Sequence, residues 1–226
     1  MRIWDIDAGF LNDKSLLGEH RELHGIYSII INGKSGYSRH PETLRWVSHL
    51  PALVIRHELL VEEMKLRGFK HHSPLGKDTL TPDWPLIFID QPAEQYRLLQ
   101  DKYVEKKEGR IPLPRNIQEL WASHKYSVMA RAPDTAKTIG KLVASGEISF
   151  DNLARKLVFL LRTSPTRGRH ANAVSHMWGY VTDYSQVDPQ ELTSSELLHE
   201  IQVESRKHNI TYLLCSTSIG ELNFWF

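Results

Sequence analysis

The terminal amine of Met1 and the carboxylate of Glu22 are the groups in this 226-residue chain whose types most directly suggest chemistry. An α-amino group has a pKa of about 7.8, against about 10.4 for a lysine side chain, so a useful fraction is neutral near neutral pH. Only a neutral amine has the lone pair that attacks an electrophilic sugar carbon. Removal of the first methionine requires a small second residue, and Arg2 is large, so we expect Met1 to be retained and its own nitrogen to be the nucleophile.

The composition is that of an ordinary globular protein, with 41% hydrophobic and 24% charged residues. These values exclude disordered and collagen-like classes, and the net charge of +1 favours no particular partner. The single cysteine, Cys215, excludes an internal disulfide and a cysteine-rich zinc module, so we expect a cytoplasmic protein. Early charged residues and the lack of an apolar run of about 18 residues argue against a signal peptide and a membrane partner.

The N-terminal region should contain two strong helices. Apolar residues recur at helical spacing over 13–30, where Asn12 or Asp13 is a suitable N-cap, and 32–41 should form an exposed loop. A second helix should begin at Pro51 and end near Arg67. We expect its core side to hold Leu53, His57, Leu60 and Met64, and its solvated side to hold Arg56, Glu62, Glu63 and Lys65.

The rest of the chain predicts a mainly α fold in three parts. A proline-rich stretch with one short helix around 93–105 should connect the two ends of the chain. Helical patterns follow at 118–130, 135–145, 150–162, 170–184 and 194–207, and a short β-like run covers 210–215. We therefore expect an N-terminal domain at 1–75, a connecting arm at 76–117 and a helical C-terminal domain at 118–226.

Glu22 should lie between glycines on one side of the first helix, because Gly18, Glu22 and Gly25 share a face away from the apolar stripe. Missing side chains beside an acid let another backbone approach, either the chain's own N-terminus or a sugar-phosphate strand. The alternative is an exposed glutamate on an amphipathic helix.

Four segments in register resemble the pyrimidine-dimer DNA glycosylases of the phage endonuclease V type. They are Arg2-Ile3, Glu19-His20-Arg21-Glu22-Leu23, Asn32-Gly33-Lys34, and Glu58-Leu59-Leu60 with Lys65-Leu66-Arg67-Gly68-Phe69. Short bacterial relatives are more similar still, through the start and through Gly36-Tyr37-Ser38-Arg39-His40-Pro41. The resemblance covers about residues 1–75.

The resemblance implies a bifunctional DNA glycosylase and abasic-site lyase that needs no cofactor. The family's attacking amine falls on Met1, and its first-helix glutamate falls on Glu22. A carboxylate there would stabilise the positive charge that builds on the sugar and would assist later proton transfers. Arg2 and Arg21 match arginines that contact the DNA backbone, and Lys34, Arg39 and His40 would extend that contact.

Two positions differ from the phage enzymes. A retained Met1 stands where those enzymes expose a small threonine, and Ser15 replaces a histidine of their site. The resemblance therefore specifies the reaction class better than it specifies the lesion. A modified pyrimidine other than a photodimer is an alternative substrate.

His20 and His24 stand one helical turn apart, which raises the question of a zinc site. Glu22 lies about 200° around the helix from His20, so it faces away from the pair. Further ligands have no compelling spacing, although His71 and His72 could be brought near. We expect a buried, hydrogen-bonded His20 and no metal.

Residues 118–226 resemble a second family, the YbgA-type domain of unknown function. The resemblance rests on Glu119-Leu120-Trp121-Ala122-Ser123-His124-Lys125-Tyr126 and on Arg167-Gly168-Arg169-His170-Ala171-Asn172, continuing to Tyr180. It implies association with nucleic acid. A surface for phosphates or bases could be formed by His124, Lys125, Arg169, His176 and Tyr180, whereas Trp121, Met129, Met177 and Trp178 fit a core.

One stretch of the C-terminal region carries only positive charge. Residues 152–182 contain no acid but include Arg155, Lys156, Arg162, Arg167 and Arg169. Such a stretch suits a polyanion, although a solvated helix face with a loop has the same pattern. We expect Lys125, Arg167 and Arg169 to contact damaged or modified double-stranded DNA. The competing hypothesis is a nucleic-acid-binding protein without activity.

Overall fold

The computed structural model describes residues 1–76 and 82–226, and within these ranges every regular element is a helix. The mainly α fold is therefore confirmed. Residues 77–81 belong to the expected connecting arm and lie outside the described part. The longer helices are α1 (Asp13–Asn32), α3 (Leu50–Leu66), α4 (Pro92–Lys102), α5 (Ile117–Met129), α6 (Pro133–Ser145), α7 (Phe150–Leu161), α8 (Arg167–Trp178) and α9 (Ser194–Lys207). The short ones are η1 (Ala8–Phe10), α2 (Pro41–Trp46), α10 (Thr211–Leu214), α11 (Ser218–Glu221) and η2 (Leu222–Phe224).

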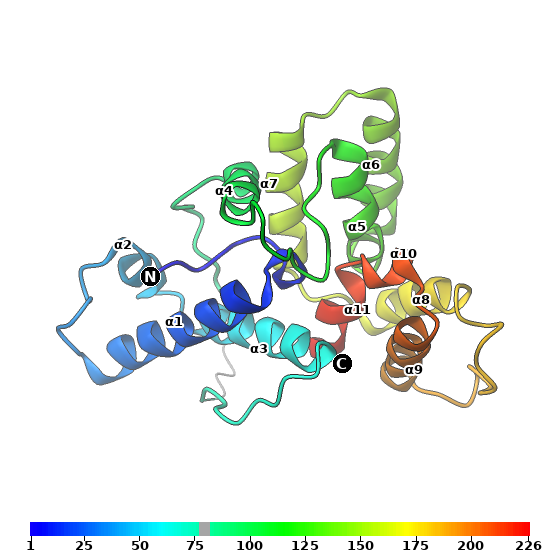
Figure 1. Cartoon of the computed structure of the whole chain (residues 1–226), viewed down its shortest axis with the longest axis horizontal. Helices are drawn as coiled ribbons and strands as arrows, with labels where there is room; N and C mark the ends of the chain where they lie inside the picture. The colour runs from blue at the N-terminus through cyan, green and yellow to red at the C-terminus, as the bar shows by residue number, and fades with distance from the viewer. Residues whose placement is uncertain (77–81) are drawn as a thin grey trace.

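The helices are spread along one long axis (Figure 1). α1 and α2 occupy one end, α8 and α9 occupy the other, and α5, α6 and α7 rise between them. The C-terminal turns α11 and η2 return to pack on α3, so the end of the chain contacts its N-terminal region. None of the helices in the described ranges is long and apolar enough to cross a membrane.

α1 begins and ends where its local sequence directs. The Asn12 side chain accepts a hydrogen bond from the Ser15 amide, which makes Asn12 the N-cap. Gly33 follows the last turn with a φ of 59°, a left-handed conformation that glycine adopts without strain. These caps fix the length of the helix that carries Glu22.

α3 differs from the expected amphipathic helix. Its core positions are buried as expected, but Arg56, Glu62 and Glu63 are buried too, and of the four residues expected in solvent only Lys65 is exposed. α1 covers one side of α3, while α11 and η2 cover another. The buried charges are paired: Glu63 contacts Arg67 and Arg110, both at 2.7 Å. Burial of an unpaired carboxylate would cost far more.

The β-like run at 210–215 was wrongly expected to be a strand. The structure has the helical turn α10 there, preceded by Asn209 in a left-handed conformation with a φ of 52°. Within the described ranges no neighbouring strand exists to pair with this segment. Packing of Leu213 into the C-terminal core favours the helical turn.

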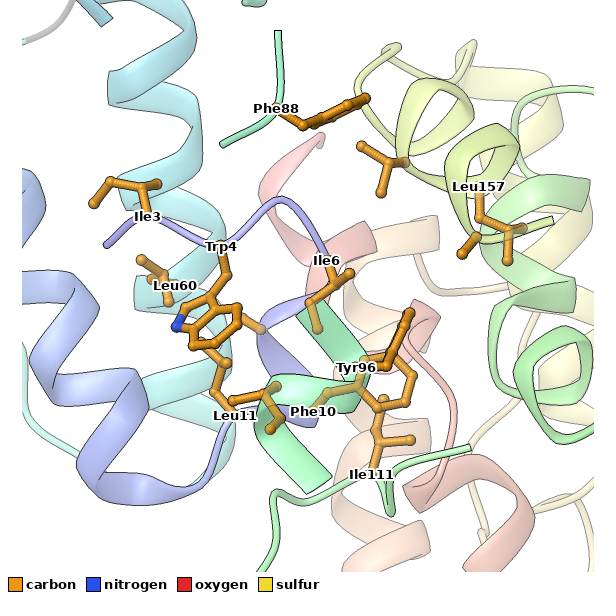
Figure 2. Close-up of a cluster of buried hydrophobic side chains, with 14 of the residues drawn as sticks. Ile3, Trp4, Ile6, Phe10, Leu11, Leu60, Phe88, Tyr96, Ile111 and Leu157 are labelled. Carbon is orange, nitrogen blue, oxygen red and sulfur yellow. The ribbon is translucent and has the colours of Figure 1, made fainter. Parts of the chain in front are cut away.

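The extended N-terminal arm, residues 1–7, runs through the main hydrophobic core. Ile3, Trp4 and Ile6 are almost fully buried, and Figure 2 shows them in one cluster with Leu60 of α3 and Tyr96 of α4. The same hydrophobic cluster continues to Val158 in α7. The three-part division at residues 75 and 118 stays a prediction, and the cluster itself extends across both positions.

Asp5 fixes the arm by buried ionic contacts with two segments that are far apart in the sequence. Its carboxylate accepts hydrogen bonds from Arg45 of the α2 helix at 2.8 Å and from Arg162, just after α7, at 2.6 Å. Arg162 also donates to the Pro85 carbonyl at 2.9 Å. Arg162 is therefore a buried structural residue and not part of a solvated or DNA-contacting basic face.

Asp7 is buried at the start of η1 and should make stability depend on pH. Burial, followed by the nearby Glu63 carboxylate, raises the pKa of Asp7 from its usual 3.8 to about 7. Between these values the folded protein holds a proton that the unfolded chain has lost. Stability is therefore greatest below pH 4 as far as Asp7 is concerned, and it falls as the pH rises towards 7.

Asp7→Asn should remove this loss while keeping the oxygen that accepts the Gly9 amide hydrogen bond. The variant's advantage in unfolding free energy should grow by up to about 1.4 kcal/mol per pH unit between pH 5 and pH 7. Urea unfolding across this range measures it. Asp134→Asn, at an exposed side chain, is the matched control. Parallel profiles for Asp7→Asn and the wild type would contradict the prediction.

Candidate active site

Side-chain oxygens hold the N-terminal arm in place. An extended segment outside any sheet must find other partners for its buried amides. Three successive amides donate to side chains: Ile3 to Glu42 at 3.0 Å, Trp4 to Glu19 at 3.2 Å and Asp5 to Gln95 at 2.8 Å. These hydrogen bonds fix the backbone from which Met1 extends.

The Met1 nitrogen lies 3.4 Å from Nε2 of His40. His40 is the N-cap of α2, and its Nδ1 accepts a hydrogen bond from the Glu42 amide at 3.1 Å. Nδ1 therefore carries no proton, and in the neutral ring the proton is on Nε2. An Nε2–H can donate to the lone pair of a neutral amine but not to an ammonium group. A lone pair that accepts this hydrogen bond must be released before the amine can attack, so the contact fixes the position of the Met1 nitrogen and does not activate it.

Met1 and Glu22 line one cleft of about 440 Å³, which we call the N-terminal cleft. Glu22 is half-buried there on α1. Gly18 lies one turn earlier, and a Cβ at this position would meet nothing within 4 Å. The cleft is therefore open beside the carboxylate. Its other lining residues are Arg2, Trp4, Lys14, Ser15, Glu19, Leu98 and Lys102.

Positive side chains border the N-terminal cleft. Arg2 forms an ion pair with Asp90 at 2.5 Å, and its guanidinium lies 4.9 Å from the centre of the Trp4 ring. Burial, together with Arg2 and Lys106, lowers the pKa of Lys102 below its usual value. This border suits a phosphate strand. It also makes Lys102 an amine to be tested beside Met1.

The two glutamates of α1 have different surroundings. Glu19 is buried, and its two oxygens accept hydrogen bonds from Arg56 at 2.8 and 3.0 Å in addition to the Trp4 amide. Its hydrogen-bonding capacity is used within the protein. Glu22 lines the same cleft and is only half-buried, so of the two carboxylates it is our candidate for contact with a substrate.

The loop between α1 and α2 presents most of the remaining N-terminal residues expected to bind DNA. Lys34 and Arg39 are exposed on it, and Arg21 is exposed on α1. Tyr37 is 71% exposed at the loop and has a φ of 57°, which is unusual for an aromatic residue. The same loop leads into His40, which contacts the Met1 nitrogen, and the Tyr37 ring lies 6.4 Å from the His40 ring.

The C-terminal candidates are not brought to this cleft. Arg167 and Arg169 are exposed at the start of α8, and neither lines the N-terminal cleft. Lys125 is exposed on α5. His124 is buried and stacks on Phe10, and burial lowers its pKa to about 4. His124 therefore cannot contribute to the nucleic-acid surface expected from the sequence.

Comparisons with known protein families find matches for two segments of the chain. Residues 1–76 match the family model described as pyrimidine dimer DNA glycosylase, and residues 125–216 match the model described as protein of unknown function (DUF1722). No curated protein and no solved structure matches the chain. Both expected resemblances are thus confirmed, and the chain carries a pyrimidine dimer DNA glycosylase domain followed by a DUF1722 domain.

Proposed function

We propose that this protein is an intracellular DNA glycosylase with abasic-site lyase activity, which excises damaged or modified pyrimidines from duplex DNA. The observation that supports it most is the shared cleft of Met1 and Glu22 inside the segment that matches the glycosylase family. The Met1 amine would be the nucleophile and Glu22 the assisting carboxylate.

The first step in this proposal is attack on the sugar. The lone pair of the neutral Met1 amine forms a bond to C1′ while the N-glycosidic bond breaks and the base leaves with its electrons. Positive charge develops on the sugar, and the Glu22 carboxylate stabilises it across the cleft. After the amine loses a proton and the sugar ring opens, the product is a protonated Schiff base at C1′.

Strand cleavage follows from the same intermediate. Removal of a proton from C2′ lets the electrons of that C–H bond expel the 3′ phosphate by β-elimination. We assign the acceptance of this proton to Glu22, which lines the cleft together with Met1. Water then hydrolyses the Schiff base and restores the free amine. His40, which contacts the Met1 nitrogen, is proposed as a positioning residue for the attack.

Opening of the duplex should involve the loop between α1 and α2. Enzymes that act on a base must draw it or its partner out of the stack. Tyr37 is exposed beside His40, with the two ring centres 6.4 Å apart, so it can stack against an unpaired base near the cleft. The cations Arg21, Lys34 and Arg39 would bind phosphates on either side.

Borohydride trapping on duplex DNA with one abasic site tests the proposal. An amine that attacks C1′ gives an adduct that borohydride reduces to a stable covalent complex, and a binding protein without activity gives none. Excision should be assayed on a panel of duplexes with photodimers and other modified pyrimidines. Absence of both adduct and base release would favour the non-catalytic alternative.

The salt dependence of DNA binding should distinguish the cations of the loop between α1 and α2 from those of α8. Replacing both Lys34 and Arg39 by alanine should weaken binding to damaged duplex DNA and reduce the slope of log affinity against log salt by about 2, since each phosphate contact contributes about 0.9. Fluorescence anisotropy between 50 and 200 mM salt measures both. An unchanged slope would contradict contact by this loop.

The pair Arg167→Ala and Arg169→Ala is the corresponding test of the DUF1722 domain. Arg167 is exposed, and Arg169 uses one nitrogen to hold the Arg131 carbonyl at 2.7 Å. If α8 touches the same duplex as the N-terminal cleft, the slope falls here too. Because neither arginine lines the N-terminal cleft, such a duplex must extend beyond the cleft.

A further inference from the structure

Four imidazoles from three separate segments meet where α1 packs against α3. His20 and His24 come from α1, His57 comes from α3, and His71 comes from the segment that follows α3. Nε2 of His57 lies 3.1 Å from Nε2 of His20 and 3.2 Å from Nε2 of His24. One ligand nitrogen from each of the four lies within 4.8 Å of all the others.

Hydrogen bonds among the four imidazoles cannot give every ring nitrogen of this cluster a partner. His57 Nδ1 lies 2.9 Å from the Glu58 carboxylate, which can only accept, so the His57 proton is on Nδ1. Nε2 of His57 then has one lone pair but faces two imidazole nitrogens. In addition, Nε2 of His71 is buried without a hydrogen-bond partner in the described part of the chain. A single cation at the centre would engage all four lone pairs.

We propose that His20, His24, His57 and His71 form a binding site for one divalent transition-metal ion, with Zn²⁺ the preferred ion. Zinc binds imidazole nitrogens at about 2.0–2.1 Å in a tetrahedron, which places the ligand nitrogens roughly 3.3 Å apart. The two shortest separations in the cluster are close to this value. The more distant imidazoles need only a small side-chain movement.

The surroundings of the cluster suit neutral imidazole ligands. Burial, followed by the other histidines, lowers the pKa of His20 to about 4, and burial also lowers the pKa of His24 and of His71. Only the neutral ring has a lone pair for a metal. The Glu58 carboxylate at His57 Nδ1 provides the hydrogen bond that commonly orients a metal-bound imidazole.

The role of this site is structural. The side chains of His20 and Glu22 point about 200° apart around α1, and the histidines do not line the N-terminal cleft. Four protein ligands leave no open position for a substrate. The ion would clamp α1 against α3 and the following segment, and so hold the helix that carries Glu22. This inference does not depend on the proposed glycosylase reaction.

Metal binding by the full chain tests the proposal. After treatment with a chelator and its removal by dialysis, titration with zinc chloride should show one tight site by calorimetry and about one ion per chain by elemental analysis. Cobalt chloride alone should give the visible absorption of tetrahedral Co²⁺. Zinc should raise the unfolding temperature, because an ion that binds only the folded state stabilises it.

Two variants and one control make the result specific. His24→Gln and His71→Gln, at half-buried positions in different segments, should each weaken zinc affinity at least tenfold and remove the Co²⁺ absorption. His176→Gln, at an exposed position of α8, should leave both unchanged. If the wild type binds no zinc beyond non-specific levels, or if both cluster variants keep wild-type affinity, the proposal is overturned.

Discussion

Moving the terminal amine by one residue is expected to reduce borohydride trapping on abasic duplex DNA at least a hundredfold. A chain that carries one extra alanine ahead of Met1 still has an α-amine, but that amine is displaced by about 3.5 Å. The arm cannot slide to compensate, because the amides of residues 3, 4 and 5 are held by side chains. Displacement of a reacting group by 1 Å costs about 10² in rate.

Two controls accompany this experiment. One tests Lys102, another amine of the cleft, and the second establishes which residue begins each protein. Lys102→Ala in the unextended protein should leave trapping intact, although Lys102 lines the same cleft and has a lowered pKa. Mass measurement of the intact proteins establishes which residue is first in each. If the extended chain is still trapped while Lys102→Ala is not, the nucleophile is Lys102.

Features governed by nearby residues could be predicted from the sequence. The first helix begins after the expected cap Asn12, because a cap acts within a single turn, and it continues two residues past the expected 13–30 to end before Gly33. The ninth helix, Ser194–Lys207, matches its expected range, and Thr193 with Glu196 forms a capping box there. The apolar stripe of α1 likewise placed Glu22 away from the core.

Features that depend on contacts between distant segments could not be predicted. Arg56 and Glu63 read as solvated residues because their partners, Glu19 and Arg110, are far away in the sequence. For the same reason the sequence does not indicate His57 as a partner of His20 and His24, and it indicates His71 only as a residue that could be brought near them. A charged residue on an apparently amphipathic helix is buried when several elements surround that helix.

The site shows the same division between local and distant determinants. Motifs in register identified Met1 and Glu22 as a pair, but only the fold shows that one cleft contains both. The contact between His40 and the Met1 nitrogen depends on the first residues lying against the start of α2. The fold also separates the candidate DNA contacts, because Arg2 lines the cleft whereas the exposed residues Arg167 and Arg169 of α8 do not.

Glu22→Gln is expected to lower base excision and strand cleavage by about 10²–10⁴, the usual range for loss of a group that assists proton transfer. Glutamine keeps the size of the side chain but removes the negative charge that would stabilise the sugar cation. Stability should change by less than about 0.5 kcal/mol, because Glu22 faces the space of the N-terminal cleft. Single-turnover kinetics and urea unfolding measure the two effects.

Glu19→Gln is the matched comparison, since it makes the same change three residues earlier on the same helix. Glu19 is buried against Arg56, so loss of its charge should cost about 3–5 kcal/mol of stability. The two variants should therefore differ in kind, with Glu22→Gln stable but inactive and Glu19→Gln unstable. An abasic site already has its aldehyde, so no glycosidic bond has to break before the amine reacts. Glu22→Gln should therefore reduce trapping on an abasic site less than it reduces base excision. If Glu22→Gln retains both excision and strand cleavage, the proposed role of this carboxylate is wrong.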